Sequence, residues 1–188
     1  ALVDGALAMR GQSNIEGRTP YQLWRNIFRW LGLVGELDAV DAGLIKLLVP
    51  DIVSLPPYHL EAASELESTK VQSRLLDALE RMIRTIGRPV VIMLEDLHWA
   101  GSENISLFAS LSQLANHLPL LLLASFRDDE RPDLPNVLPN ATHLKLNRLN
   151  EADIAELSQA MLGETGTKEQ VVQLLQRETE GNVFFLIE

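Results

Sequence analysis

The sequence contains no cysteine, which excludes disulfide bonds and thiolate metal sites. Its 26 acidic residues outnumber 16 basic ones, giving a formal net charge of −10. That balance argues against a surface that binds nucleic-acid phosphates, because such contacts need lysine and arginine. The four histidines are scattered without helical pairing, so the sequence also argues against a zinc site. We therefore expect no direct contact with nucleic acid from this segment.

Long hydrophobic runs are missing as well. The longest, around residues 120–124, is far too short to span a bilayer. No basic stretch precedes the first apolar residues as it would in a signal peptide. We therefore expect a cytoplasmic protein that makes no membrane contact.

What remains is ordinary globular material, with 46% apolar and 22% charged residues. A chain of 188 residues can bury one core and a small appendage. It begins at Ala1 without Met and ends at Glu188 inside an apolar run. Because natural termini usually fray into polar residues, we expect a piece of a longer polypeptide.

The most informative stretch, residues 90–99, reads VVIMLEDLHW. Its apolar, β-branched start predicts a strand buried on both faces of a parallel sheet. Glu95 and Asp96 follow at the carboxyl end of this strand, the edge at which α/β sheets bind ligands. Two carboxylates there would hold Mg²⁺ and orient a water at a nucleotide phosphate. The alternative is a buried strand that ends in a solvated acidic turn.

The surrounding pattern indicates an α/β fold. Apolar residues at helical spacing predict helices over residues 21–34, 37–48, 64–86 and 102–117. Strands are expected at residues 6–10, at Leu120–Ala124 and, more weakly, at 142–146. A polar loop is expected from Gly11 to Pro20. Two buried strands joined by one amphipathic helix form a βαβ unit, so the sheet should be parallel.

After residue 147 the pattern is helical only. Three helix starts are expected, at Asn150, at Thr167 with Gln170 as a capping box, and at Gly181-Asn182. We therefore assign residues 1–147 to an α/β core and residues 148–188 to the start of a helical subdomain.

Arg127 follows the second buried strand, beside the end that carries the two acids. Carboxylates at one strand end and a guanidinium at the next suit a nucleoside triphosphate with its metal. The alternative is a solvated salt bridge within residues 127–130.

Four motifs together resemble one family. Residues 94–100, LEDLHWA, resemble the Walker B region of STAND-class signalling ATPases, which are AAA-like P-loop proteins. Residues 121–130, LLLASFRDDE, resemble the sensor strand of that family. Residues 180–188, EGNVFFLIE, look like its GNPFFL-type segment, and residues 19–21 like the start of its first helix. The resemblance covers nearly the whole chain.

The resemblance implies a domain of bacterial multidomain signalling and transcription regulators, with ATP and Mg²⁺ bound in the full-length parent. It implies a parallel P-loop NTPase-type sheet with helices on both faces, followed by a small helical subdomain. Glu95 matches the Mg²⁺-associated position and Asp96 the position that polarises the attacking water, so both are expected metal ligands. Arg127 matches the sensor arginine, and Gly181 and Asn182 the segment near the base. Fused or partner output domains are implied, and the sequence is compatible with oligomerisation.

Three departures from the family pattern stand out. No G-x-x-x-x-G-K-[ST] motif occurs, so the phosphate-binding loop and its lysine are missing from these residues. Gly101 replaces the usual Asp, and Val183 the usual Pro. In the family, the P-loop strand lies centrally in the sheet and precedes the segment that begins here. We therefore expect an incomplete sheet and an inactive isolated chain that binds ATP weakly or not at all.

Two other functions remain open. The chain could be a non-catalytic protein-interaction module built on a degenerate NTPase fold, which the departures at Gly101 and Val183 would fit. A DNA-contacting initiator-type ATPase has a related fold, but the acidic balance and the lack of a basic helix disfavour it.

Overall fold

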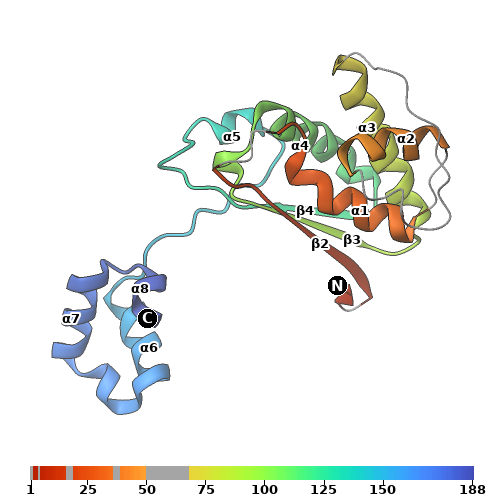
Figure 1. Ribbon diagram of the computed structural model, residues 1–188. Helices are drawn as coiled ribbons and strands as arrows, with labels where there is room; N and C mark the ends of the chain where they lie inside the picture. Colours follow the sequence, from red (N-terminus) through yellow and green to blue (C-terminus); the bar gives the residue numbers. More distant parts are fainter. Residues whose placement is uncertain (1, 4, 16–18, 36–38, 50–67) are drawn as a thin grey trace. The chain divides into compact units, whose positions relative to one another are not determined.

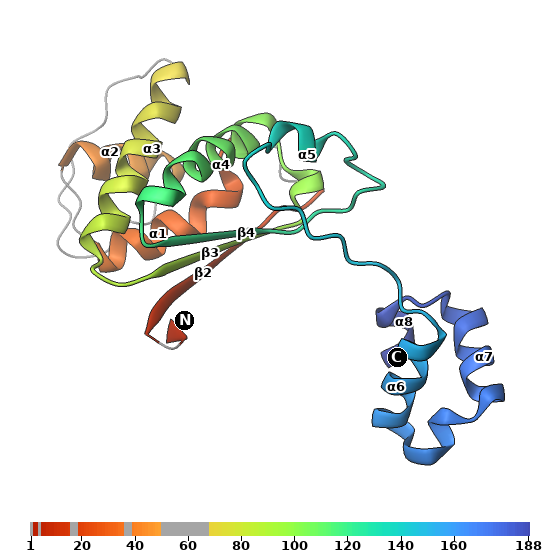
Figure 2. The same cartoon turned by 180° about the vertical axis from the view of Figure 1, so that it is seen from behind.

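The structure is a computed structural model that describes residues 2–3, 5–15, 19–35, 39–49 and 68–188. It contains two compact units, Ala1–Ala141 and Thr142–Glu188. Figure 1 and Figure 2 show the elements of both units from opposite sides.

The first unit is built on a four-stranded sheet in the order β1-β2-β3-β4. The strands are β1 (Leu2–Val3), β2 (Ala6–Gln12), β3 (Val90–Glu95) and β4 (Leu120–Ala124). β1 pairs antiparallel with β2, whereas β2, β3 and β4 run parallel to one another. Gln12 lies opposite Glu95, and Leu94 lies opposite Ala124. The parallel α/β sheet predicted from the sequence is confirmed, and three strand ends meet at one edge.

Helices lie between and after these strands. They are η1 (Gln22–Trp24), α1 (Arg25–Val34), α2 (Ala39–Leu48), α3 (Ser68–Thr85), η3 (Leu97–Trp99), α4 (Ser102–Leu114), η4 (Ala115–His117) and α5 (Leu134–Val137). The predicted helices are confirmed where the structure describes them, whereas residues 37–38 and 64–67, the expected starts of α2 and α3, lie outside the described residues. β2 runs two residues further than predicted, to Gln12.

The core lies between these helices and one face of the sheet. Its largest fully buried side chains come from η1, α1, α2, α3 and β3: Trp24, Ile27, Phe28, Leu31, Ile45, Leu75, Leu79, Met82, Ile83, Ile92 and Leu94. In both figures α1, α3 and α4 lie on the same side of the sheet.

The opposite face of the sheet is exposed within the described residues. Met93 is 39% exposed, Leu121 52% and Leu123 42%. In β3, residues that face the helices alternate with residues that do not. The prediction that β3 is buried on both faces is therefore wrong for this structure, because the described helices cover one side only.

The second unit is helical, with α6 (Glu151–Leu162), η5 (Gly163–Thr167), α7 (Glu169–Thr179) and α8 (Val183–Ile187). Asn150 begins α6 as predicted, since its Oδ1 accepts hydrogen bonds from the backbone N–H groups of Ala152 and Asp153. The Asp153 carboxylate in turn accepts from the Asn150 N–H, which completes a capping box.

Two expectations for this unit are wrong. Thr167 and Gln170 form no capping box, because the Thr167 hydroxyl donates backwards to Glu164 O at 2.9 Å and α7 begins after Lys168. Residues 142–146 form no strand. Leu144 and Leu146 are 84% and 85% exposed. An alternating sequence forms a strand only where a neighbouring strand pairs with its backbone N–H and C=O groups, and these residues have no such neighbour among the residues that the structure describes. No helix in the described part of the chain is both long and apolar enough to cross a membrane.

Candidate functional site

Backbone hydrogen bonds continue to join β3 and β4 past the last paired residues of the sheet. The Ser125 N–H donates to Leu94 O at 2.9 Å, and the Leu97 N–H donates to Ser125 O at 2.9 Å. Between them Asp96 has φ 58 and ψ 42, a left-handed conformation that few residues other than glycine adopt. This bend ends β3 and turns the chain into η3.

The two predicted metal ligands are held by side chains of β2. Glu95 forms an ion pair with Arg10, and the Gln12 side-chain amide donates to the Asp96 carboxylate at 2.9 Å. Arg10 and Gln12 are two residues apart on one strand, so they project from the same face. Arg10 ends the predicted strand and Gln12 lies beyond it, and neither was predicted as a site residue. Their contacts depend on the register of β2 against β3, which the sequence alone does not supply.

Gly11 allows this arrangement because η1 crosses directly against it. A Cβ atom at Gly11 would lie 2.2 Å from the backbone oxygen of Leu23, a distance that no side chain tolerates. Tyr21, at the start of η1, is buried with φ 56. Burial, together with the nearby Glu103 charge, raises the pKa of the Tyr21 phenol. Tyr21 therefore stays protonated and uncharged in the physiological range.

Arg127 lies just past β4 and pairs with acids of its own loop. Its Nη1 is 3.0 Å from Glu130 Oε1, and its Nε is 3.9 Å from Asp129 Oδ1. The Arg127 side chain is 63% exposed. These are contacts of the kind that a solvated salt bridge would make, and the role of Arg127 as a phosphate sensor stays a prediction.

His98 and Trp99 connect the end of β3 to this loop. The His98 side chain is 1% exposed, and its Nδ1 accepts a hydrogen bond from the Arg127 N–H at 3.3 Å. The Trp99 indole N–H donates to Glu130 Oε2 at 3.1 Å. No role could be assigned to either ring from the sequence, and Glu130 was not predicted as a site residue, because these partners lie about thirty positions apart.

The carboxylates fit a Mg²⁺ ion that arrives with a phosphate. Mg²⁺ is usually bound by one or two carboxylates together with waters and substrate phosphates. Among the described residues, no three His, Cys, Asp or Glu side chains are grouped to hold a metal. The carboxylates available for such a site are Glu95 and Asp96, whose oxygens already attract the Arg10 guanidinium and the Gln12 amide. Their role as metal ligands stays a prediction.

Gly181 and Asn182 have structural contacts within the second unit. The Leu149 N–H donates to Gly181 O at 2.9 Å, and a Cβ at Gly181 would lie 2.1 Å from Leu149 O. Asn182 Oδ1 accepts from the Phe184 N–H at 3.0 Å and so caps α8. A contact of these two residues with a nucleotide base stays a prediction.

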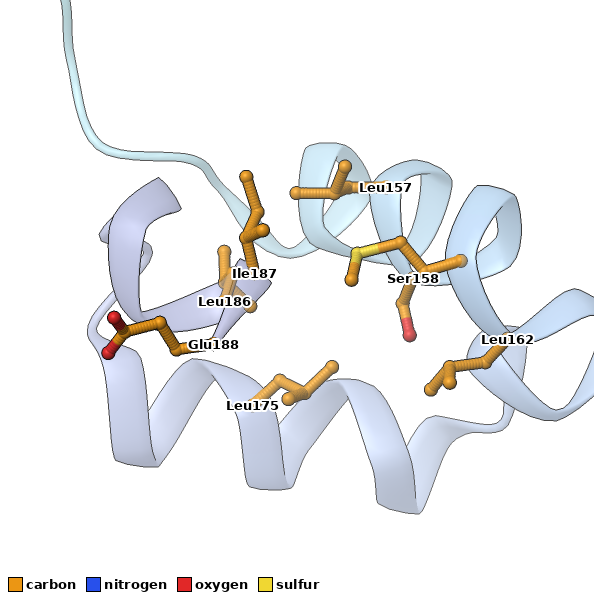
Figure 3. A pocket seen from close by; sticks show the side chains of 8 residues that line it. Leu157, Ser158, Leu162, Leu175, Leu186, Ile187 and Glu188 are labelled. Atoms are coloured by element: carbon orange, nitrogen blue, oxygen red, sulfur yellow. The ribbon is translucent and has the colours of Figure 1, made fainter.

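The second unit also contains an apolar cleft of about 170 Å³ (Figure 3). Its lining comes from α6, α7 and the end of the chain: Leu157, Ser158, Met161, Leu162, Leu175, Leu186, Ile187 and Glu188. No predicted site residue lines this cleft.

Comparison with known proteins identifies the family. A family model described as AAA ATPase domain matches residues 3–123, which is more than half of the chain. The chain therefore belongs to the AAA ATPase domain family. The matched region contains Glu95 and Asp96, whereas Arg127 and the second unit lie beyond it. No match was found among curated proteins or among solved structures.

Proposed function

We propose that this chain carries the Walker B acids and the sensor arginine of a regulatory ATPase of the STAND class. ATP binding and slow hydrolysis would switch the full-length protein between closed and open states and so control fused or partner output domains. One observation carries the proposal. Glu95 and Asp96 end one parallel strand, and Arg127 follows the adjacent one, at a single edge of a sheet from an ATPase family.

The proposed roles follow from the chemistry of each side chain. Glu95 and Asp96 would hold Mg²⁺, which neutralises phosphate oxygens when it is bound. Asp96, steadied by the Gln12 amide, would accept a hydrogen bond from the attacking water. Arg127 would donate to a phosphate oxygen, because a guanidinium forms strong charge-assisted hydrogen bonds with phosphate. Arg10 contacts Glu95 Oε2, so a metal that uses this oxygen would compete with the guanidinium.

The test uses the full-length protein with Glu95→Gln or Asp96→Asn. Each change keeps the side-chain shape and removes one negative charge. We expect ATP hydrolysis to fall by about 100-fold or more, while the Kd for ATP changes by less than about threefold. Phosphate release measures the first quantity and calorimetric titration the second. Asp133→Asn is the matched control, because Asp133 is an exposed acid that accepts a hydrogen bond from Arg131 and is not one of the proposed site residues.

Unchanged turnover in both variants would overturn the assigned roles. If the unmodified full-length protein binds ATP and never hydrolyses it, the chain is instead a non-catalytic interaction module on an NTPase fold.

A further inference from the structure

The Glu130 carboxylate lies close to three other side chains at the carboxyl edge of the sheet, those of Arg127, His98 and Trp99. Its Oε1 lies 3.0 Å from Arg127 Nη1 and 3.9 Å from His98 Nε2. Its Oε2 accepts the Trp99 indole N–H at 3.1 Å. One carboxylate from the loop after β4 therefore contacts both rings of η3, the turn that follows Asp96 directly.

The His98 ring leaves one hydrogen-bond donor unsatisfied. Because His98 Nδ1 accepts from the Arg127 N–H, the proton of the neutral ring belongs to Nε2. That Nε2 is buried and has no hydrogen-bond partner among the described residues. A buried donor without a partner is unfavourable, and the carboxylate oxygen facing it is the one that Arg127 holds.

We propose that Glu130 is a positioning residue that exchanges Arg127 for His98 when a phosphate binds. This inference rests on the proposed role of Arg127. In the structure, Glu130 holds the guanidinium. Once Arg127 turns to a phosphate, Oε1 moves about 1 Å to reach an ordinary hydrogen-bond distance from His98 Nε2.

Two features make this exchange energetically balanced. The ion pair that is lost is largely exposed, with side-chain exposures of 63% for Arg127 and 37% for Glu130, and such pairs contribute little. The hydrogen bond that is gained satisfies a buried group of His98. The Trp99 indole keeps its hydrogen bond to Glu130 Oε2 while Oε1 moves from Arg127 to His98. A change in the position of Arg127 therefore alters the contacts of η3, the turn that follows Asp96.

The first experiment needs no nucleotide. The indole ¹H–¹⁵N signal of Trp99, assigned with a Trp99→Phe variant, is compared in the unmodified 188-residue chain, Glu130→Gln and Glu130→Ala. We expect the signal to move in both Glu130 variants because the indole loses its charged acceptor. Asp129→Asn is the matched control, since Asp129 is also near Arg127 and no contact joins it to Trp99. An indole signal unmoved in both Glu130 variants would overturn the inference.

The second experiment adds ATP and Mg²⁺ to the full-length protein. The Trp99 signal should move on ATP binding in the unmodified protein and in Asp129→Asn, and stay fixed in Glu130→Gln. Freed from its partner, Arg127 should bind ATP about two- to fivefold more tightly in Glu130→Gln. ATP binding with an unmoved Trp99 signal in the unmodified protein contradicts the exchange alone. Absence of ATP binding contradicts the proposed function and the inference together.

Discussion

At the scale of single residues, the site depends on backbone positions that tolerate few side chains. Gly11 lies so close to Leu23 that β2 and η1 could not pack as they do with any other residue there. Arg10 and Gln12, the neighbours of Gly11, contact Glu95 and Asp96. A residue without a side chain therefore places the partners of both predicted metal ligands.

Replacing Gly11 by Ala should destabilise the protein strongly. The new Cβ would meet backbone rather than a movable side chain, so β2 or η1 must shift. We expect a loss of at least about 2 kcal/mol in the free energy of unfolding, measured by urea denaturation.

Gly101→Ala is the control for this change. Gly101 is the N-cap of α4 in an extended conformation, and a Cβ there would be 3.4 Å from the end of the Glu103 side chain. Its cost should stay below about 1 kcal/mol, from a poorer helix cap. Equal losses in the two variants would show that the close approach at Gly11 is not what constrains it.

At the scale of elements, β3 has one covered face and one exposed face. Ile92 is fully buried under the helices, whereas Met93, the next residue, is 39% exposed. Both side chains are large and apolar. Their contributions to stability should differ according to the face on which they lie.

This difference predicts the outcome of two alanine substitutions in the 188-residue chain. Ile92→Ala should lower the free energy of unfolding by about 2–5 kcal/mol, because it removes buried groups and leaves a cavity. Met93→Ala should lower it by less than about 1 kcal/mol. Chemical denaturation of the two variants measures both values. A large loss for Met93→Ala would indicate that this face is covered in solution.

The elements themselves could be predicted from the sequence because their signals are local. The apolar runs at residues 90–94 and 120–124 and the Asn150 cap each depend on a few neighbouring residues. The covered faces could not be predicted, since a strand such as LLLLA looks the same with one face buried or two.

Long-range partners were equally beyond reach of the sequence. Glu95 pairs with Arg10 across 85 positions, and Glu130 meets Trp99 across 31. The strand ends Glu95 and Asp96 could be identified from the sequence, while the side chains that hold them required the register of β2 against β3.

At the scale of the whole molecule, the second unit begins with an irregular segment. Residues 142–149 carry no regular secondary structure, and residues 142–148 are exposed. Lys145 and Arg148 lie in this segment. Proteases cut most readily at exposed segments of this kind.

Limited trypsin digestion should therefore cut first at Lys145 or Arg148, and mass spectrometry of the early products would identify the site. Lys145→Gln should move the cut to Arg148, and the double variant with Arg148→Gln should suppress it. Early cleavage inside α3 or α4 would contradict this prediction.

The exposed side of β4 has a consequence for self-association. β4 pairs with β3 along one edge, and no described strand pairs with its other edge. The unpaired backbone groups of such an edge can pair with a strand of another copy and so begin aggregation. The exposed leucines of β4 favour this association. We expect Pro119 before the strand and Arg127 beyond its end to oppose this process, and the net charge of −10 to make copies of the chain repel one another. The loop of residues 127–130, which we propose responds to a phosphate, would thus also limit self-association through β4.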